Sequence, residues 1–216
     1  MEVKMITIAL AKGRLADKAI ELLEQIGIDC SEVKEPSRKL ILYSKDKNVR
    51  FIMVKPSDVP TYVEHGVADM GIAGKDTLLE EGKSLYEMLD LKFGKCRIAV
   101  AGFPEKRDLW ITHAHTRVAT KYPNIARNYF SQRGETIEII KLNGSVELGP
   151  LIGLSDIIVD IVESGKTLEE NGLEILEEIC TVSARLVVNR VSLKTKHSEI
   201  KRIIDGIQGI LEESKV

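Results

Sequence analysis

The chain has 216 residues, of which 44% are hydrophobic and 30% are charged, and its formal net charge is −2. This composition excludes a disordered chain and gives no overall positive field that would draw the protein to nucleic acid or to a membrane surface. No apolar segment is long enough to cross a bilayer, and the first residues lack the pattern of a signal peptide. We therefore expect a cytoplasmic globular protein with one large or two small domains.

A pair of cations stands between the first two predicted elements. Residues 4–11 form an apolar, β-branched run that predicts a strand, and apolar residues at helical spacing over 15–26 predict a helix. The connecting turn contains Lys12, Gly13 and Arg14. Arg14 could contact a polyphosphate through two hydrogen bonds and Lys12 could act as a point charge, although two solvated loop charges are the alternative.

The next segment predicts further strands and helices. Residues 40–43 and 50–54 predict a hairpin or two neighbouring strands, and residues 57–65 predict a helix with a capping serine and an early acid. An apolar strand over 69–74 follows, entered through an aspartate and left through a glycine. A fresh apolar strand begins at 97, which places a lobe boundary near 91–95.

The second half continues the alternation of strands and helices. Strands are predicted over 118–120 and 136–142, with a helix between them that ends near 133. The pair His113 and His115 could share one face and bind a metal, but without a third ligand we interpret it as a surface loop. The three cysteines are far apart and support neither a disulfide framework nor a zinc site. An apolar stripe over 200–211 predicts a final helix that docks on a core or contributes an oligomer contact.

The stretch 147–168 contains the most informative pattern. An apolar run over 157–161 predicts a buried parallel strand, interrupted by Asp160 and followed by a turn at Ser164 and Gly165 and a helix from Thr167. Such a turn at the carboxyl end of a strand offers backbone N–H groups to a phosphate. Asp160 and Glu163 instead suit ribose hydroxyls or a magnesium ion. An ordinary strand-to-helix turn is the alternative.

The chain contains a weak internal repeat. Gly66-x-x-Asp69 precedes one short apolar strand, and Gly153-x-x-Asp156 precedes the strand described above. Each is preceded by a predicted helix with a serine and an early acid at its start. The pattern suggests two lobes of related architecture, although chance similarity between two helix–strand units is the alternative.

These motifs together resemble the family of ATP phosphoribosyltransferases, the first enzymes of histidine biosynthesis. The resemblance includes an acid at 147, Gly153-x-Ser155, Asp160 and Ser164-Gly165-x-Thr167-Leu168. It extends through four further motifs and covers nearly the whole chain: Lys12-Gly13-Arg14-Leu15, Gly66-Val67-Ala68-Asp69-x-Gly71, Ala119-Thr120-Lys121-Tyr122-Pro123 and Leu142-Asn143-Gly144-Ser145-Val146-Glu147.

The resemblance implies an α/β fold of two lobes like periplasmic binding protein type II, with the ligand cleft between them. It implies a first lobe of residues 1–93 and 182–216 and a second of 94–181. The implied reaction is displacement at the anomeric carbon of phosphoribosyl pyrophosphate by N1 of the adenine of ATP, a glycosyl transfer that needs no covalent protein nucleophile and no metal held by the protein alone. Magnesium would accompany the pyrophosphate.

The resemblance also assigns residues to the substrates. Asp160, Lys12 and Arg14 are the implied catalytic residues. Phosphoribosyl pyrophosphate would be bound by Asp160, Glu163, Ser164, Gly165, Lys166 and Thr167. The ATP and pyrophosphate side would be bound by Lys12, Gly13, Arg14, Arg50, Asp69 and Gly71.

The chain resembles the short form of this family. That form works with a regulatory subunit similar to the catalytic domain of histidyl-tRNA synthetase, which implies a dimer of catalytic subunits within a hetero-octamer. Two other functions remain open: a cytoplasmic two-lobed sensor of a phosphorylated metabolite, and a salvage phosphoribosyltransferase that uses a free base. The acid at 160 together with the cations at 12 and 14 favours the enzyme, because a sensor for one small anion does not need both.

Overall fold

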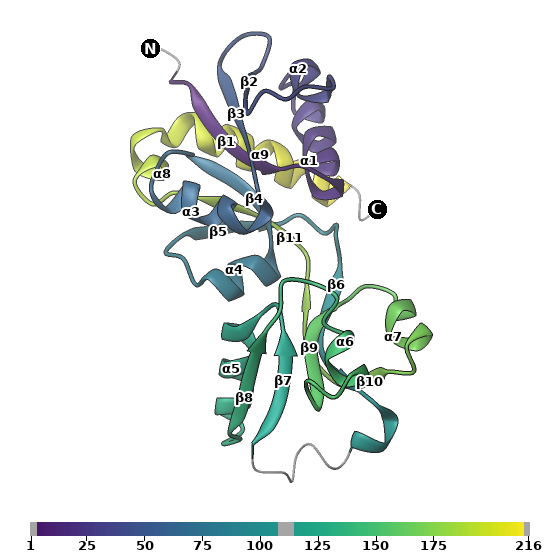
Figure 1. Cartoon of the computed structure of the whole chain (residues 1–216). Helices are drawn as coiled ribbons and strands as arrows, with labels where there is room; N and C mark the ends of the chain where they lie inside the picture. Colours follow the sequence, from purple (N-terminus) through teal and green to yellow (C-terminus); the bar gives the residue numbers. More distant parts are fainter. Residues whose placement is uncertain (1–3, 108–114, 214–216) are drawn as a thin grey trace. The chain divides into compact units, whose positions relative to one another are not determined.

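The computed structural model describes residues 4–107 and 115–213. The chain forms two compact units (Figure 1). Unit 1 consists of Met1–Gly94 and Ser183–Val216, and unit 2 of Lys95–Val182. Unit 2 is thus inserted as one continuous segment between two segments of unit 1. Within the described ranges, no helix has the length and apolar character that a membrane span requires.

A mixed sheet of six strands forms the centre of unit 1, in the order β2-β3-β1-β4-β11-β5. Strands β3, β1 and β4 are parallel, β2 is antiparallel to β3, and β11 is antiparallel to both β4 and β5. In chain order the elements are β1 (Ile6–Ala11), α1 (Arg14–Gln25), α2 (Ser31–Lys34), β2 (Ile41–Tyr43), β3 (Val49–Val54), η1 (Pro56–Asp58), α3 (Val59–Glu64), β4 (Met70–Gly74), α4 (Lys75–Glu81), β5 (Tyr86–Asp90), β11 (Ala184–Val188), α8 (Ser192–Thr195) and α9 (His197–Glu213).

Strand β1 is buried on both faces, because helices cover both sides of this sheet. Ile8 and Leu10 belong to the apolar cluster that includes residues of α1 and α9. Ala9 belongs to a second cluster, which contains Val59 and Val63 of α3. The apolar stripe of the final helix is therefore a core face, with Ile200, Ile203, Ile204 and Ile207 buried.

A mixed sheet of five strands forms the centre of unit 2, in the order β10-β6-β9-β7-β8. Strands β8, β7 and β9 are parallel, and β6 is antiparallel to both of its neighbours. In chain order the elements are β6 (Cys96–Gly102), η2 (Pro104–Lys106), β7 (Thr116–Thr120), α5 (Pro123–Gln132), β8 (Ile137–Lys141), α6 (Leu148–Leu151), β9 (Ile157–Val162), α7 (Lys166–Glu170) and β10 (Glu174–Val182).

The same hydrogen-bond motif occurs at the start of the central strand of each unit. Asp69 N donates to Thr7 O over 2.8 Å, and Asp69 Oδ2 accepts from Thr7 N over 2.8 Å. In unit 2, Asp156 N donates to Arg117 O over 2.9 Å, and Asp156 Oδ2 accepts from Arg117 N over 3.0 Å. The repeat predicted around these two aspartates is confirmed, and it aligns β1 with β7 and β4 with β9.

A glycine lets the helix before the central strand approach the sheet in both units. A Cβ atom on Gly71 of β4 would lie 2.8 Å from the side chains of Val59 and Val63 in α3. In unit 2 the glycine is on the helix instead, where a Cβ atom on Gly149 of α6 would lie 2.9 Å from Cβ of Ala119 in β7. The glycine that permits this close approach is therefore on the strand in unit 1 and on the helix in unit 2.

Several local predictions differ from the structure. The sequence patterns do not reveal β5 and β10, which lie at sheet edges and mix exposed polar with apolar residues. The central strand β9 is parallel to β7 but antiparallel to β6, so it is not the strand of an all-parallel sheet. Neither α3 nor α6 has the predicted side-chain hydrogen bond at its N-cap. His113 lies outside the described residues, and His115 is exposed.

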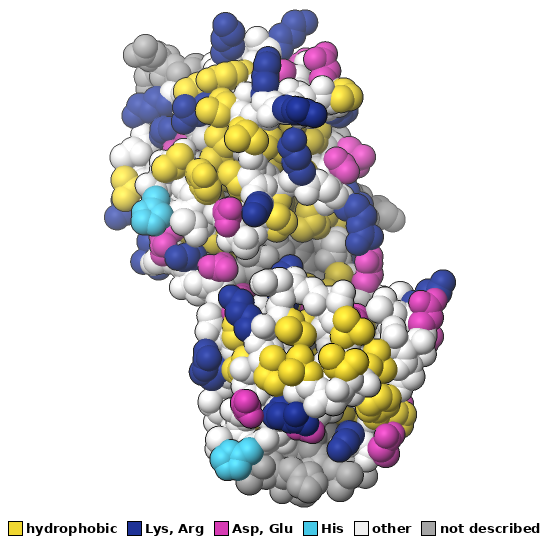
Figure 2. Space-filling model, viewed as in Figure 1, with side chains coloured by type: hydrophobic (Ala, Val, Ile, Leu, Met, Phe, Trp, Pro, Cys, Tyr) yellow, Lys and Arg dark blue, Asp and Glu magenta, His cyan; other side chains and the backbone are white. Residues whose placement is uncertain are grey.

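Each unit also carries exposed apolar side chains. In unit 2 they gather on the face that carries α6 (Figure 2), where Leu148, Leu151, Ile152 and Leu154 are exposed. In unit 1 they include Leu40, Ile41 and Tyr43 around the edge strand β2. The backbone N–H of Tyr43 is already bound by the carboxylate of Glu32 over 2.8 Å, which covers part of that strand edge.

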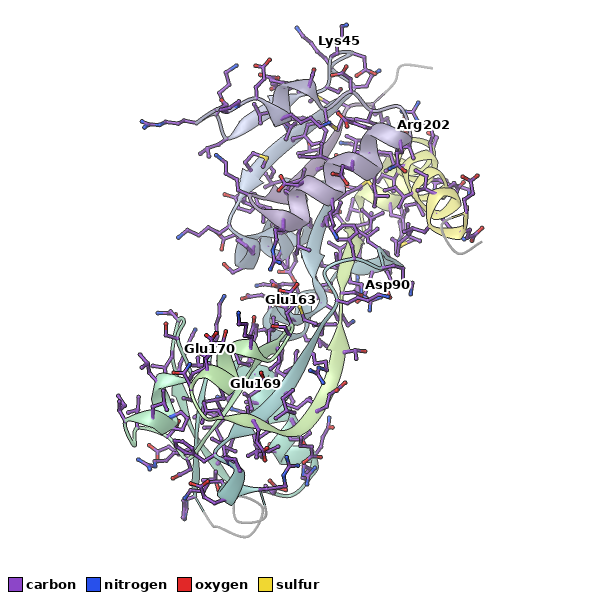
Figure 3. The ribbon with its side chains drawn as sticks, turned by 90° about the vertical axis from the view of Figure 1, so that its right-hand side faces the viewer. Lys45, Asp90, Glu163, Glu169, Glu170 and Arg202 are labelled. Carbon is purple, nitrogen blue, oxygen red and sulfur yellow. The ribbon has the colours of Figure 1, made fainter. Side chains whose placement is uncertain are left out.

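Asp90 holds together the two segments of unit 1 that lead to and from unit 2 (Figure 3). Its carboxylate accepts from Ser183 Oγ over 2.7 Å and from Lys92 N over 3.0 Å, and it pairs with Arg185 Nη1 over 3.1 Å. Partial burial acts to raise the pKa of Asp90, but the hydrogen bonds from Lys92 and Ser183 outweigh it and hold the pKa well below its usual range.

We expect Asp90→Asn to lower the free energy of unfolding by about 2 kcal/mol near pH 7, as is typical of hydrogen bonds to a charged group. Because the pKa is depressed in the folded state, this stabilisation is complete above about pH 5 and is lost progressively as the pH falls toward the depressed folded pKa. Urea unfolding of both proteins between pH 7 and pH 2.5 should show curves that converge in acid. Asp205→Asn, which removes an exposed ion pair on α9, should change little at any pH.

Candidate functional site

The loop after β9 has the geometry of an anion-binding turn. Gly165 is the N-cap of α7 and has φ 84°, a left-handed conformation that favours glycine. A Cβ atom there would meet only Val162 Cγ1, at 3.9 Å, so glycine is required for its conformation and not for space. Glu163, Ser164, Lys166 and Thr167 are exposed around it, and Figure 3 shows Glu163 at the end of β9.

The first N–H groups of a helix have no acceptor within the helix. In α7 the first i to i−4 hydrogen bond is from Glu169 N to Gly165 O, over 3.1 Å. The N–H of Lys166 makes only a long contact of 3.4 Å with Ser164 Oγ. These amides and the partial positive charge of the helix start suit a phosphate group.

Asp160 lies on β9 just before this loop. The pairing of β9 with β7 ends at Val159, opposite Thr120, so Asp160 is at the carboxyl end of the parallel strands. Because side chains alternate along a strand, its half-buried carboxyl group is on the same face as Val162, which packs with Leu168 of α7. The structure therefore brings Asp160 and the loop 163–167 to the same end and face of the unit 2 sheet.

The predicted cations of unit 1 also lie at a strand end. Gly13 is the N-cap of α1 with φ 120°, and its carbonyl accepts from Ala16 N over 2.8 Å. Lys12 and Arg14 flank it and are exposed, and Lys12 Nζ contacts Ser37 O at 3.3 Å. Lys12, Gly13 and Arg14 thus form a basic turn at the carboxyl end of β1, where open α/β sheets bind ligands.

Arg50 does not join this basic turn. Its register partner on β1 is Thr7, and Arg50 Nε donates to Thr7 Oγ1 over 3.1 Å. Thr7 precedes Lys12 by five residues, which corresponds to about 16 Å along an extended strand. Arg50 is therefore at the amino ends of β1 and β3, apart from the basic turn along the strand, and its assignment to the phosphate side stays a prediction.

Asp69 and Gly71, which are predicted to contact substrate, both have structural contacts within unit 1. Asp69 precedes β4 and is 3% exposed, and its carboxylate accepts from Ser192 Oγ and from Lys196 Nζ, each over 2.7 Å. These bonds join β4 to the segment around α8 and α9. Gly71 is inside the sheet beneath α3, as described above. Both positions contribute to packing, and their contact with substrate stays a prediction.

We expect Asp69→Asn to destabilise unit 1 without affecting substrate binding. The substitution leaves Lys196 half-buried without its counter-charge, which costs about 3 kcal/mol. The midpoint of urea unfolding should fall, whereas the KM values for both substrates at a temperature where the variant is folded should be unchanged. A large rise in either KM would instead indicate that Asp69 contributes to substrate binding.

Unit 1 has a second strand-to-helix turn at an equivalent strand end, which is not among the predicted site residues. Gly74 and Lys75 stand between β4 and α4, as Gly165 and Lys166 stand between β9 and α7, and a threonine follows at 77 and at 167. In unit 1 the carboxylate of Asp76 lies against Gly74 on the side where a Cβ atom would be, and Lys75 Nζ pairs with Glu87 over 2.6 Å. The repeated Gly-Lys motif is the sequence signal that could have identified this second turn.

Magnesium would find oxygen donors near the phosphate loop. Asp160 and Glu163 carry carboxylates, the ligand type that Mg²⁺ prefers. Among the residues that the structure describes, no group of three or more His, Cys, Asp or Glu side chains could hold a metal ion by itself. The carboxylates of Asp160 and Glu163 could therefore supply ligands to a magnesium ion.

Comparison with known proteins gives matches over nearly the whole chain. The family model described as "HisG: ATP phosphoribosyltransferase" matches residues 55–209. A protein of Lachnoclostridium phytofermentans named ATP phosphoribosyltransferase is 58% identical over 214 residues, covering 98% of this chain and 100% of that protein. One of the same name from Clostridium kluyveri is 52% identical, with 97% and 95% covered.

Solved structures match the fold as well. The ATP phosphoribosyl transferase (HisG:HisZ) complex from Thermotoga maritima contains a chain that is 39% identical with a TM-score of 0.84, covering 98% of this chain and 100% of that one. A histidine kinase sensor domain similar to periplasmic binding proteins gives a TM-score of 0.61 at 12% identity, covering 98% and 92% of the two chains, and shows the fold alone. The two-lobed α/β architecture predicted from the sequence is confirmed. With the family model matching well over half of its residues, the chain belongs to the HisG family of ATP phosphoribosyltransferases.

Proposed function

We propose that this protein catalyses transfer of the phosphoribosyl group from phosphoribosyl pyrophosphate to N1 of the adenine ring of ATP, the first step of histidine biosynthesis. The bond from the anomeric carbon to N1 forms, the bond to the pyrophosphate oxygen breaks, and the configuration inverts. The observation that carries the proposal is the combination of Asp160 with the loop 163–167 at one strand end, in a chain of this family.

In unit 2, the loop would bind the 5′-phosphate. The amides at the start of α7 and the hydroxyls of Ser164 and Thr167 supply donors, and Gly165 gives the turn its conformation. Lys166 and Glu163 flank the turn. Asp160 would accept hydrogen bonds from the ribose hydroxyls, because an ionised carboxylate is an acceptor only. This arrangement would fix the sugar for attack at the anomeric carbon.

In unit 1, the basic turn would bind the departing pyrophosphate or the triphosphate of ATP. Arg14 can bind two phosphate oxygens at once, and Lys12 can neutralise charge as a compact cation. N1 of adenine is a weak nucleophile, so alignment of the substrates and stabilisation of the leaving group are the main contributions open to the protein. Magnesium enters as part of the substrate, bound to the pyrophosphate, and screens the same charge.

A regulatory partner belongs to this proposal. The Thermotoga maritima structure is a complex of HisG with HisZ. We propose a corresponding partner here, similar to the catalytic domain of histidyl-tRNA synthetase, and a dimer of catalytic subunits within a hetero-octamer. A cytoplasmic location follows from the proposal, because ATP and phosphoribosyl pyrophosphate are cytoplasmic metabolites.

The test is formation of phosphoribosyl-ATP from ATP and phosphoribosyl pyrophosphate, with and without magnesium and with and without the HisZ-like partner. Product is expected only with magnesium and should increase when the partner is added. Adenine in place of ATP should give none, and product from adenine would identify a salvage enzyme. Tight binding of phosphoribosyl pyrophosphate without any product would indicate that the protein is a sensor and not an enzyme.

A further inference from the structure

Thr120 is the last residue of β7, and its side chain is fully buried. The hydroxyl donates to the carbonyl oxygen of Val159 on β9 over 2.6 Å and accepts from the N–H of Tyr122 over 2.8 Å. Both distances are short for neutral hydrogen bonds, and both partners are main-chain groups. The hydroxyl is thus fixed between the end of one strand and the neighbouring strand.

The backbone of the same residue reaches the third parallel strand. The carbonyl oxygen of Thr120 accepts from Leu142 N, just after β8, over 3.0 Å. Thr120 therefore connects the carboxyl ends of β7, β8 and β9. This is the end of the sheet that carries Asp160.

The hydroxyl acts on the peptide group next to Asp160. The carbonyl of Val159 belongs to the peptide that joins Val159 to Asp160, and backbone pairing between β7 and β9 stops at this position. On the other side of β9, Asp160 is opposite Ala99 of β6. At the last paired residues of β7 and β9, the hydroxyl of Thr120 adds a side-chain hydrogen bond to this peptide.

The internal repeat provides a comparison within the same molecule. The aligned aspartates 69 and 156 make Leu10 the counterpart of Thr120 and Ala73 the counterpart of Asp160. Leu10 is fully buried, so an apolar side chain without a hydroxyl fills the equivalent position in unit 1. The fold of the unit does not require a threonine here. The hydroxyl and the acid occur together in unit 2 and are both missing from unit 1.

We propose that Thr120 is a positioning residue for the sugar-binding acid: its hydroxyl holds the Val159–Asp160 peptide and so aims the Asp160 carboxylate at the ribose of phosphoribosyl pyrophosphate. The inference rests on the proposed function, because it assigns Thr120 to the sugar half of that reaction. Removing the hydroxyl takes one donor from the carbonyl of Val159 and one acceptor from the N–H of Tyr122, both in a buried position. The strand end then relaxes, and the carboxylate loses its alignment.

The test compares Thr120→Val with Thr120→Ser in the complex with the regulatory partner. Valine keeps the shape of threonine, whereas serine keeps the hydroxyl. Thr116→Val is the matched control, because Thr116 is a buried threonine at the amino end of the same strand. For each protein we would measure kcat, the KM for ATP, the melting temperature, and the Kd for phosphoribosyl pyrophosphate in the absence of ATP.

We expect Thr120→Val to lower kcat about 10-fold and to weaken the binding of phosphoribosyl pyrophosphate about 5-fold, with the KM for ATP unchanged, since a misplaced group commonly costs such factors. Thr120→Ser should restore most of both losses. Thr116→Val should lower the melting temperature without changing either constant. In an Asp160→Asn background, adding Thr120→Val should have little further effect, because the two residues act as one unit.

Three results would overturn the inference: wild-type constants for Thr120→Val, failure of serine to restore them, or additive effects of the Thr120 and Asp160 substitutions. The binding measurement separates this inference from the proposed function. If the wild-type complex binds phosphoribosyl pyrophosphate but makes no product, the reaction is wrong, and the Kd series still decides the role of Thr120. If it neither binds nor reacts, both are wrong.

Discussion

Gly165→Val should raise the KM for phosphoribosyl pyrophosphate about 5- to 150-fold, which corresponds to about 1–3 kcal/mol of backbone strain at a left-handed position. Gly165 has φ 84°, and a β-branched residue strongly resists that conformation. The chain can relieve the strain only by rotating the peptides that begin α7. Those peptides carry the amides proposed to bind the 5′-phosphate. Steady-state kinetics with saturating ATP would give the KM directly.

Gly172→Val provides a matched control at the other end of the same short helix. Gly172 also has a left-handed conformation, with φ 69°, and no atom lies within 4 Å of the position of its Cβ. Strain in the backbone should be comparable, so the two variants should lose similar stability. Only the change at 165 should affect the KM for phosphoribosyl pyrophosphate. Equal KM values in the two variants would show that this loop does not bind the 5′-phosphate.

Asp160→Asn should lower kcat about 10- to 150-fold while leaving the fold intact. The estimate assumes the loss of a hydrogen bond to a charged group, worth about 1.5–3 kcal/mol. Asparagine has the same shape as aspartate, so packing around β9 is preserved. Single-turnover measurements with the regulatory partner would show whether the chemical step is slowed. A wild-type rate would exclude a role for this carboxylate at the ribose.

Asp156→Asn is the contrasting change at the amino end of the same strand. The carboxylate of Asp156 binds Arg117 through Nε over 3.2 Å and Nη2 over 3.1 Å. Hydrogen bonds from the Arg117 side chain lower the pKa of Asp156, although partial burial opposes them. This substitution should therefore reduce stability and leave kcat unchanged. Opposite outcomes for the two aspartates would establish that the two ends of β9 have different functions.

Local patterns predict much of this fold because most of its strands are continuous apolar runs between turn residues. Residues 157–161 and the turn at Ser164 and Gly165 are predicted close to their observed bounds, since burial on both faces leaves a clear signal. Strand β10 is not predicted, because it is an edge strand whose glutamates face solvent. Its pairing with β6 depends on residues more than seventy positions away.

The candidate site was only partly accessible to sequence reasoning for a related reason. Asp160 and the loop 163–167 follow one another along the chain, so their proximity is a local property. The sequence does not show which end of a parallel strand Arg50 and Asp69 occupy, and an acid that precedes a strand is at the end away from the ligand side. The partners of Asp69, Ser192 on α8 and Lys196 just after it, are more than 120 residues distant, and no local pattern identifies them.

The strand order of unit 1 also has a consequence for how the protein is made. Strand β11 lies between β4 and β5, yet it is synthesised after all of unit 2. On the ribosome, the sheet of unit 2 can therefore form before β11 is available to pair with β4 and β5. Until β11 is inserted, the edges of these two strands that pair with it are open to other chains. Nascent chains are thus exposed to aggregation from the completion of β5 until the insertion of β11.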